Sequence, residues 1–335
     1  MVKICIAKSL WGCIEASDPQ TWAEMFARIK KDGYSAVESI LIFDFNQNPF
    51  LFRQLLDKYQ LDLIIQLHTG SDWSKYDYCT SCDIDVHVAS FRALVQDALQ
   101  HRPVVINVHS GHDSWDTATA VSYFQQVLAI EKELLVGEFA NVVLVHETHR
   151  QRLLFSPYQA RDILAHPSLA ALKINCDLSH WVCVCERLFD EKEGRDCWWP
   201  AVLDTVARHC LLIHARVGHA EGPQVVDPRA SPAELQAHVG WWKRLLQKQL
   251  ERGGSRPVYV TAEHGPEPYQ SFDTPSVNAS ATGSGSGSAS VVKAWKTGGK
   301  SNMTEAEKSA VLWEINDFVR AAVCTLFAEL EERRS

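Results

Sequence analysis

The chain has 335 residues, of which 46% are hydrophobic and 22% are charged, and its formal net charge is -8. This balance is typical of a folded globular protein and excludes disorder over most of the chain. A negative net charge repels polyanions, and the sequence has no Lys/Arg cluster that would offset it. We therefore expect no nucleic-acid substrate.

The sequence carries no signal for export or for membrane insertion. The apolar segment Ile4 to Ala7 is too short for a signal-peptide core, and no apolar stretch approaches the roughly 20 residues of a membrane span. We expect a cytoplasmic protein whose ten cysteines are reduced thiols. Cys79 and Cys82 form a C-x-x-C without a second pair, so a metal or redox role there is a minor alternative. A homo-oligomer is compatible with the sequence.

Eight short, apolar, β-branched runs recur along the chain, separated by longer segments with helical signals. Continuous apolar runs are typical of parallel strands that are covered on both faces. The repeated strand and helix pattern, without a Gly-rich nucleotide-binding turn, predicts a single (β/α)8 TIM barrel and leaves an open doubly wound sheet as the alternative. The predicted strands are Val2–Ala7, Ala36–Ile42, Leu61–Leu67, Val104–Val108, Val142–His146, Leu172–Asn175, Leu211–His214 and Pro257–Ala262.

Three helix starts have the chemistry of a capping box, with a hydroxyl at the N-cap and Glu or Gln three residues later. They begin at Ser156, Ser231 and Thr304. The Gly/Ser-rich stretch within Ser276 to Met303 has a composition that cannot bury a core, which predicts a flexible insertion. We expect a barrel over 1–273, a disordered insertion over 274–303 and a helix over 304–333 that completes the barrel wall.

Polar side chains follow most of the predicted strands, at the end of a parallel barrel where chemistry is located. Glu147, Asp177, His214 and Glu263 follow or close strands five to eight, and carboxylates that converge there would repel one another. A bound cation resolves this repulsion. The mixed oxygen and nitrogen donors suit Mn²⁺, Co²⁺, Mg²⁺ or Zn²⁺.

Each of these residues also has a structural interpretation, because one polar residue at a strand end is commonly a hydrogen-bonding partner. For Asp177 and Glu263 the alternative is a salt-bridge network with nearby arginines. The arginines concerned are Arg150, Arg152 and Arg216.

Four segments, in this order, resemble the xylose isomerase-like TIM barrels, a family of sugar isomerases, epimerases and endonuclease IV-type repair nucleases. The resemblance covers the chain from about Val2 to Tyr269. The segments are VHETHR (145–150), NCDLSHW (175–181), HARVGHAEGPQV (214–225) and TAEHGPEPY (261–269).

The resemblance implies that one metal is held by Glu147, Asp177, His214 and Glu263, and that Glu147 and Glu263 are also the proton-transfer pair. Such an enzyme would isomerise or epimerise a small sugar through a metal-stabilised enediolate. Many ketose epimerases of the family have a second Glu where this chain has Leu153, so the substrate stays open. The further substrate-binding candidates are His180, Arg216, His68, His109 and the rim aromatics Trp11 and Trp181.

Two other function classes remain as alternatives. A metal-dependent phosphodiesterase of the endonuclease IV type would share much of the ligand series, but its further zinc needs an Asp-x-His. Here Asp227 is followed two residues later by Arg229, whose guanidinium stays protonated. A catalytically silent binding barrel would be expected to have a broken ligand set, which the sequence does not have.

Overall fold

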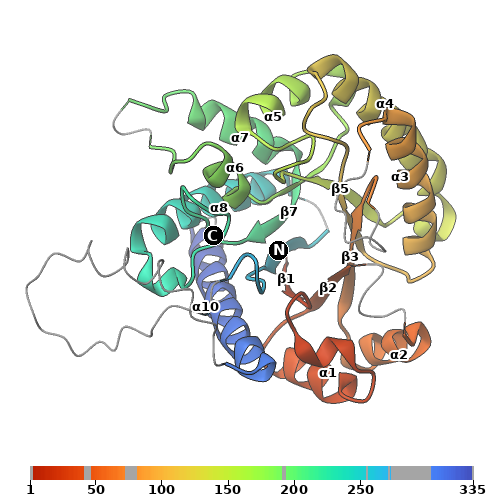
Figure 1. Ribbon diagram of the computed structural model, residues 1–335, viewed down its shortest axis with the longest axis vertical. Coiled ribbons are helices and arrows are strands. Elements are labelled where there is room, and N and C mark those ends of the chain that lie inside the picture. Colours follow the sequence, from red (N-terminus) through yellow and green to blue (C-terminus); the bar gives the residue numbers. More distant parts are fainter. Residues whose placement is uncertain are drawn as a thin grey trace, which may run out of the picture.

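Eight parallel strands form a closed barrel in the order β1 to β8, which confirms the predicted TIM barrel (Figure 1). The computed structural model describes residues 3–40, 47–71, 81–190, 194–253, 256–270, 272 and 303–333. Each predicted strand is present, and its bounds lie within two residues of the prediction. The strands are β1 (Ile4–Ser9), β2 (Ala36–Ile40), β3 (Asp62–His68), β4 (Val105–His109), β5 (Val143–Glu147), β6 (Ile174–Cys176), β7 (Cys210–Ala215) and β8 (Val258–Ala262).

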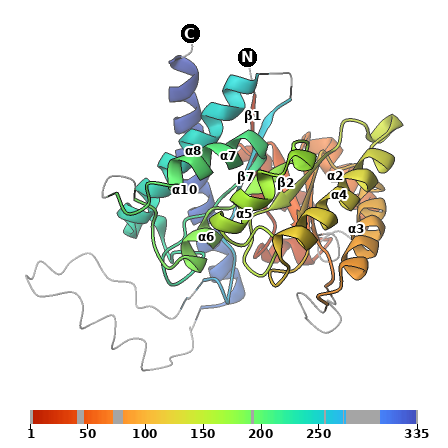
Figure 2. The same cartoon turned by 90° about the horizontal axis from the view of Figure 1, so that it is seen from above.

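Helices surround the barrel and bury their apolar faces against its outer surface (Figures 1 and 2). The longer ones are α1 (Trp22–Lys31), α2 (Pro49–Tyr59), α3 (Ile84–Leu99), α4 (Thr117–Leu134), α5 (Pro157–Leu164), α7 (Trp199–His209), α8 (Pro232–Arg252) and α10 (Glu305–Glu332). The short ones are α6 (Ser179–Val184), η1 (Ile14–Ser17), η3 (Gly137–Phe139), η4 (Pro167–Leu169) and η5 (Pro228–Ala230). No helix in the described part of the chain is long and apolar enough to cross a membrane.

The three predicted helix starts have different outcomes. Thr304 forms the complete capping box with Glu307, and the Ser156 side chain accepts the backbone N–H of Gln159. Ser231 occupies the N-cap of α8, but its side chain makes no capping hydrogen bond, so that part of the prediction is wrong. The reason is local: Ser231 is also the C-cap of the short helix η5, and the turn out of η5 sets its backbone angles.

α10 completes the barrel wall beside α8 and also anchors the end of β8 (Figure 1). The Asn316 side chain accepts the backbone N–H of His264 at 2.7 Å and donates to the His264 carbonyl at 3.0 Å. Both groups are buried, so the two bonds satisfy a stretch of backbone that has no strand partner at this point. The last helix therefore fixes the position of the neighbouring residue Glu263.

Two predictions concern residues outside the described part of the chain. The Gly/Ser-rich stretch between 276 and 302 and Cys79 of the C-x-x-C lie there, so the flexible insertion and the C-x-x-C site stay predictions. No disulfide joins the cysteines that the structure describes.

Candidate metal centre

The barrel interior has an apolar layer and a polar layer, because alternate strand residues point inward. Its apolar layer contains Cys5, Ala7, Ala36, Ile64, Val105, Val143, Val145, Leu212 and Tyr259. The following inward positions are polar and buried: Glu38, Gln66, Asn107, Glu147, Asn175, His214 and Thr261. The next residues inward on four strands are His68, His109, Asp177 and Glu263. Ligand-type side chains thus converge at the carboxyl end of the barrel.

Glu147, the last residue of β5, lies within this polar layer. Its Oε2 accepts Nδ2–H bonds from Asn107 at 2.6 Å and from Asn175 at 3.1 Å, and it lies 2.9 Å from His109 Nε2. Its Oε1 is buried and has no hydrogen-bond partner among the described residues. A carboxylate oxygen that is desolvated without a partner is costly, unless a cation or substrate occupies the space beside it.

His214, in β7, links three carboxylates. Its Nδ1 lies 2.8 Å from Glu263 Oε2 and 3.6 Å from Glu147 Oε2. Its Nε2 lies 3.0 Å from both carboxylate oxygens of Glu38. Burial alone would lower the pKa of His214, but Glu263, Glu38 and Glu147 together raise it well above its ordinary value.

Asp177 directly follows β6 and is completely buried. Ser179 donates to its Oδ1 from the backbone N–H at 3.1 Å and from the hydroxyl at 2.5 Å. The Arg216 guanidinium pairs with Oδ2, and it also lies 3.4 Å from Glu263 Oε2. The alternative in which Asp177 and Glu263 form salt bridges with a nearby arginine is therefore observed for Arg216.

Neither of the other two arginines joins that network. Arg152 is buried and donates to the backbone carbonyls of Thr69 and Gly111, while the Arg150 guanidinium lies over the Tyr269 ring.

The carboxylates of the cluster differ in their affinity for protons. Burial raises the pKa of Glu147 against the opposing effect of His214, and it raises the pKa of Asp177 to about 6 although Arg216 opposes this. For Glu263 burial acts in the same direction, but His214 and Arg216 outweigh it and lower its pKa to about 2. Burial and the neighbouring carboxylates thus oppose ionisation of Glu147 and Asp177, an effect that a bound metal would reverse.

The donor atoms form three overlapping groups, each with its atoms within 4.8 Å of one another. They are His109, Glu147 and His149; Glu147, Asp177 and His180; and Asp177, His214 and Glu263. All four predicted ligands belong to these groups, so the structure brings them together at one place. Carboxylate and imidazole donors with unpartnered buried atoms at Glu147 Oε1 and His180 Nδ1 fit a divalent cation.

Four imidazoles line one side of the cluster. The ring centroids of His68 and His109 are 4.3 Å apart, those of His109 and His149 are 4.5 Å apart, and those of His149 and His180 are 3.8 Å apart. Burial lowers the pKa of each of them well below its ordinary value, so these rings are neutral near pH 7. His180 Nε2 lies 2.8 Å from Arg216 Nη2.

No protein-family model and no curated protein sequence matches the chain. A solved L-ribulose 3-epimerase superposes with a TM-score of 0.56 at 10% identity, over 100% of this chain and 97% of its own. A zinc-bound IolI protein gives 0.55 at 10% identity, over 94% and 98%. A magnesium-bound xylose isomerase-like TIM barrel protein from Mycobacterium smegmatis gives 0.52 at 12% identity, over 98% and 100%.

This chain has the fold of the xylose isomerase-like TIM barrels. Identities this low establish the fold alone. The reaction depends on the chain's own residues.

The two predicted rim tryptophans are placed differently. Trp11 is partly exposed, packs edge-on against Tyr269 with ring centroids 5.0 Å apart, and lies against Gly265, where a side chain would collide with it. Trp181 is completely buried, donates to the Leu154 carbonyl at 2.8 Å and packs against other aromatics of the core. Trp181 is therefore a core residue and not the rim residue that the sequence predicted.

Sequence reasoning did not select four residues that shape the site. Glu38, Asn107 and Asn175 hold His214 and Glu147 in place, and Tyr269 lies beside Arg216, whose guanidinium is 5.0 Å from its ring. A sequence signal exists for Asn107 and Asn175. They precede His109 and Asp177 by two residues, and residues two apart on a strand point to the same side. Tyr269 ends the last of the four segments on which the xylose isomerase-like resemblance rests.

Proposed function

We propose that the protein is a divalent-metal-dependent isomerase or epimerase of sugars or sugar-like keto-polyols. The observation that carries this proposal is the convergence of Glu147 and Glu263, from strands β5 and β8, on the same imidazole nitrogen of His214. Two carboxylates at one cation site could serve as the acid and the base in proton transfer to and from a substrate carbon. Metal-bound structures of the same fold add support.

Glu147, Asp177, His214 and Glu263 would hold the cation, which would be Mn²⁺, Co²⁺, Mg²⁺ or Zn²⁺. When bound, it would polarise the adjacent carbonyl and hydroxyl oxygens of the substrate and so ease removal of a carbon-bound proton. The cation also changes the protonation of the cluster, because metal ligands bind in their deprotonated forms. Asp177 and Glu147 would then be ionised and His214 neutral.

One glutamate removes the carbon-bound proton, and a glutamate returns a proton either to the neighbouring carbon or to the opposite face of the same carbon. The first outcome is isomerisation and the second is epimerisation. Glu263 is the proposed base, and the Arg216 guanidinium, 3.4 Å from its Oε2, favours its ionised form. A positioned general base of this kind contributes about 10²–10⁴-fold to the rate.

His180 and Arg216 are the proposed contacts to substrate oxygens, because they lie together beside Asp177. His68 and His109 extend the same wall with neutral imidazoles that can donate or accept one hydrogen bond at each nitrogen. Trp11 and Tyr269 would cover the apolar face of the sugar at the partly exposed rim.

The phosphodiesterase alternative loses support at Asp227. This carboxylate caps η5 and pairs with the Arg229 guanidinium at 2.8 Å, and Arg229 also pairs with Glu314. Asp227 is thus committed to a surface ion-pair network instead of a metal. A nuclease would still be revealed by cleavage of an abasic-site oligonucleotide.

The proposal is tested by metal analysis followed by a substrate screen. We expect the purified protein to bind about one divalent ion per chain, and Asp177→Asn to lose most of it. Asp204→Asn is the matched control, because it removes a carboxylate of α7 that pairs with Arg244 of α8. The loaded protein is then screened with ketoses and keto-polyols for uptake of solvent deuterium into carbon-bound positions. No metal binding, or metal binding without exchange into any of them, would reject the proposed function.

A further inference from the structure

Arg150 has a charge that the described protein does not balance. Its side chain is partly exposed in the turn that follows β5, three residues after Glu147. Its guanidinium lies 4.9 Å from the centroid of the Tyr269 ring, and its Nη1 lies 4.0 Å from Cys183 Sγ. No carboxylate of the described residues forms an ion pair with it, whereas Arg216 pairs with both Asp177 and Glu263.

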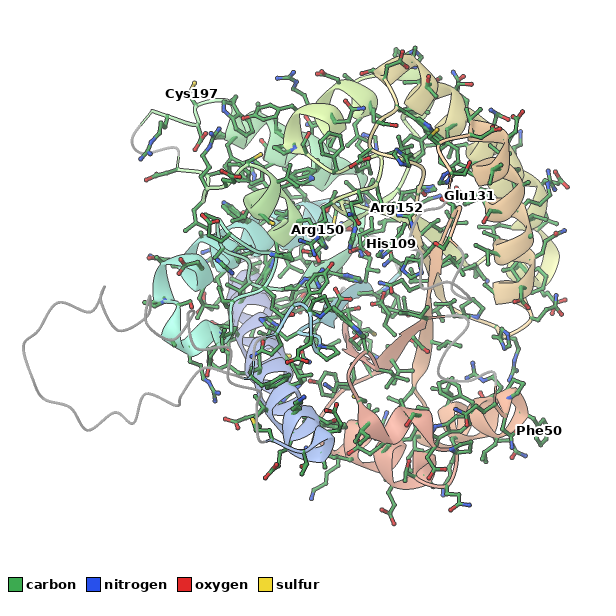
Figure 3. The ribbon with its side chains drawn as sticks, in the orientation of Figure 1. Phe50, His109, Glu131, Arg150, Arg152 and Cys197 are labelled. Atoms are coloured by element: carbon green, nitrogen blue, oxygen red, sulfur yellow. The ribbon has the colours of Figure 1, made fainter. Side chains whose placement is uncertain are left out.

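The Tyr269 ring lies beside both Arg150 and Arg216, which places the unbalanced charge of Arg150 next to the proposed substrate site. The guanidinium groups of Arg150 and Arg216 lie 4.9 Å and 5.0 Å from the centroid of the same ring. In Figure 3 the labels of Arg150, Arg152 and His109 lie near the centre of the ring of helices.

The neighbouring cation Arg152 has a different role. It is completely buried, and its Nη1 donates to the carbonyls of Thr69 and Gly111 at 2.6 and 3.2 Å. These bonds tie the loops after β3 and β4 to the loop after β5, which is a structural function. The Arg150 guanidinium instead contacts the side chains of Tyr269 and Cys183 in the described residues, and neither of them is a carboxylate that would balance its charge.

A guanidinium presents parallel N–H groups that match the two oxygens of a carboxylate or phosphate. A neutral sugar that covered Arg150 would remove water from the cation without replacing it by an opposite charge, which is unfavourable. An anionic group would compensate the charge and would be held by bidentate hydrogen bonds. The aromatic ring beneath the guanidinium pre-orients the fork for this contact.

We propose that the substrate of this site carries a terminal carboxylate or phosphate that Arg150 binds, while its reacting carbons lie at Glu147 and Glu263. This inference rests on the proposed function, since it places the reacting end at the metal cluster. Arg216 remains paired with Asp177 and Glu263. Arg150 sets the preference for an acidic substrate over a neutral ketose. Carboxylate and phosphate share this chemistry and are separated by the experiment.

The experiment measures binding of ligand pairs to the metal-loaded protein by calorimetry. The probes are D-fructose as the neutral ketose, D-fructose 6-phosphate as its phosphate and D-fructuronate as the corresponding keto acid. We expect at least one anionic probe to bind about tenfold or more tightly than D-fructose, with an affinity that falls as salt is added. The anionic probe that binds more tightly identifies the preferred group.

Two variants and one control assign the preference to Arg150. Arg150→Gln should weaken the preferred anionic probe by about 10–100-fold, the range expected for a charged hydrogen bond, and should reduce the ratio of anionic to neutral affinity at least tenfold. Arg150→Lys keeps the charge without the fork and should restore only part of the ratio. Arg53→Gln removes another partly buried guanidinium, on α2 and paired with Asp57, and should keep the wild-type ratio.

Equal binding of neutral and anionic probes, no detectable binding of either, or an unchanged ratio in Arg150→Gln would overturn the inference. Solvent-deuterium exchange in the same samples reports separately on the proposed function. Charge-selective binding through Arg150 without exchange would therefore reject the isomerase proposal and support the anion site. Exchange without charge selectivity would support the isomerase proposal and reject the anion site.

Discussion

Glu38 of β2 accepts the Nε2–H of His214 of β7, with 3.0 Å from the nitrogen to each carboxylate oxygen. The bond crosses the barrel interior and directs His214 Nδ1 toward Glu263, 2.8 Å away. Thr261 donates its hydroxyl hydrogen to Glu38 Oε2 at 2.5 Å, so the carboxylate is itself held in place. Glu38 thus acts as a positioning residue for the proposed ligand, in the manner of carboxylates that orient metal-binding histidines.

Replacing Glu38 by Gln should weaken metal binding about 10–100-fold, the usual effect of losing such a partner. The amide keeps the shape and can still accept one hydrogen bond, but it no longer makes His214 a stronger donor. Metal titration by calorimetry measures the change. Glu131→Gln, on α4 at the outside of the barrel, is the control and should keep the wild-type affinity (Figure 3). Unchanged affinity in Glu38→Gln would show that Glu38 does not position His214.

Replacing Arg216 by Met should make the protein far more dependent on its metal for stability. Without a metal, Arg216 balances Asp177 and Glu263 in a buried setting, and loss of one partner of a buried pair costs about 3–5 kcal/mol. A bound cation would supply the missing charge. Thermal unfolding with and without Mn²⁺ should therefore show a larger metal-induced rise in Tm for this variant than for wild type. The same rise in both would contradict a metal at this place.

His238 of α8 should contribute to acid sensitivity. Gly218 N–H donates to its Nε2 at 3.3 Å and its Nδ1 donates to the Glu234 carbonyl at 2.9 Å, so the buried ring is held neutral. Burial lowers the pKa of His238 from an ordinary 6.5 to about 4. Because the unfolded chain takes up the proton first, stability is fully present above pH 6.5 and is lost as the pH falls toward 4. The loss is on the order of 3 kcal/mol.

The test compares the free energy of unfolding in urea at several pH values between 4 and 7. His238→Gln does not titrate in this range, so its stability should fall less steeply with pH than that of wild type. His166→Gln removes an exposed imidazole and serves as the control. An identical slope in wild type and His238→Gln would contradict this explanation.

Deleting residues 276–300 should leave folding and metal content nearly unchanged. The composition of the segment predicts a flexible connection between the barrel and α10, and the entropy of closing a loop varies only slowly with its length. Circular dichroism, thermal unfolding and metal analysis of the shortened chain provide the comparison. A loss of several degrees in Tm, or of activity, would indicate that the segment packs against the barrel.

The fold was predictable because each strand is an apolar, β-branched run in the sequence between segments with helical patterns. Strand bounds were predicted up to two residues early or late, since the run loses its apolar character where the chain reaches the polar layer. His68, His109 and Glu147 are the last residues of their strands and were read as following them. A parallel barrel is polar inside at that end, so hydrophobicity alone misplaces the boundary.

The ligand candidates were also predictable, because carboxylates and histidines followed successive strands. The pairing of Arg216 with Asp177, and of Glu38 with His214, was not. These contacts depend on how the closed barrel brings side chains of different strands together in its interior, and no local sequence pattern signals this. The position of Trp181 was predicted wrongly for a similar reason. It follows a strand end in sequence, but it lies in the helical turn α6 and is buried against Trp199 of α7 and the Leu154 carbonyl.

Solvent-deuterium exchange in wild type and Glu263→Gln is the most direct test of the central claim. Gln keeps the size of the side chain and one oxygen but removes the charge and the basic lone pair. We expect the metal-loaded wild type to wash deuterium into the carbon-bound position of a keto-polyol substrate. We expect Glu263→Gln to bind the same compound and to exchange at least about 10²-fold more slowly. Exchange at the wild-type rate in Glu263→Gln, or cleavage of an abasic-site phosphodiester without exchange into any sugar by wild type, would contradict the account.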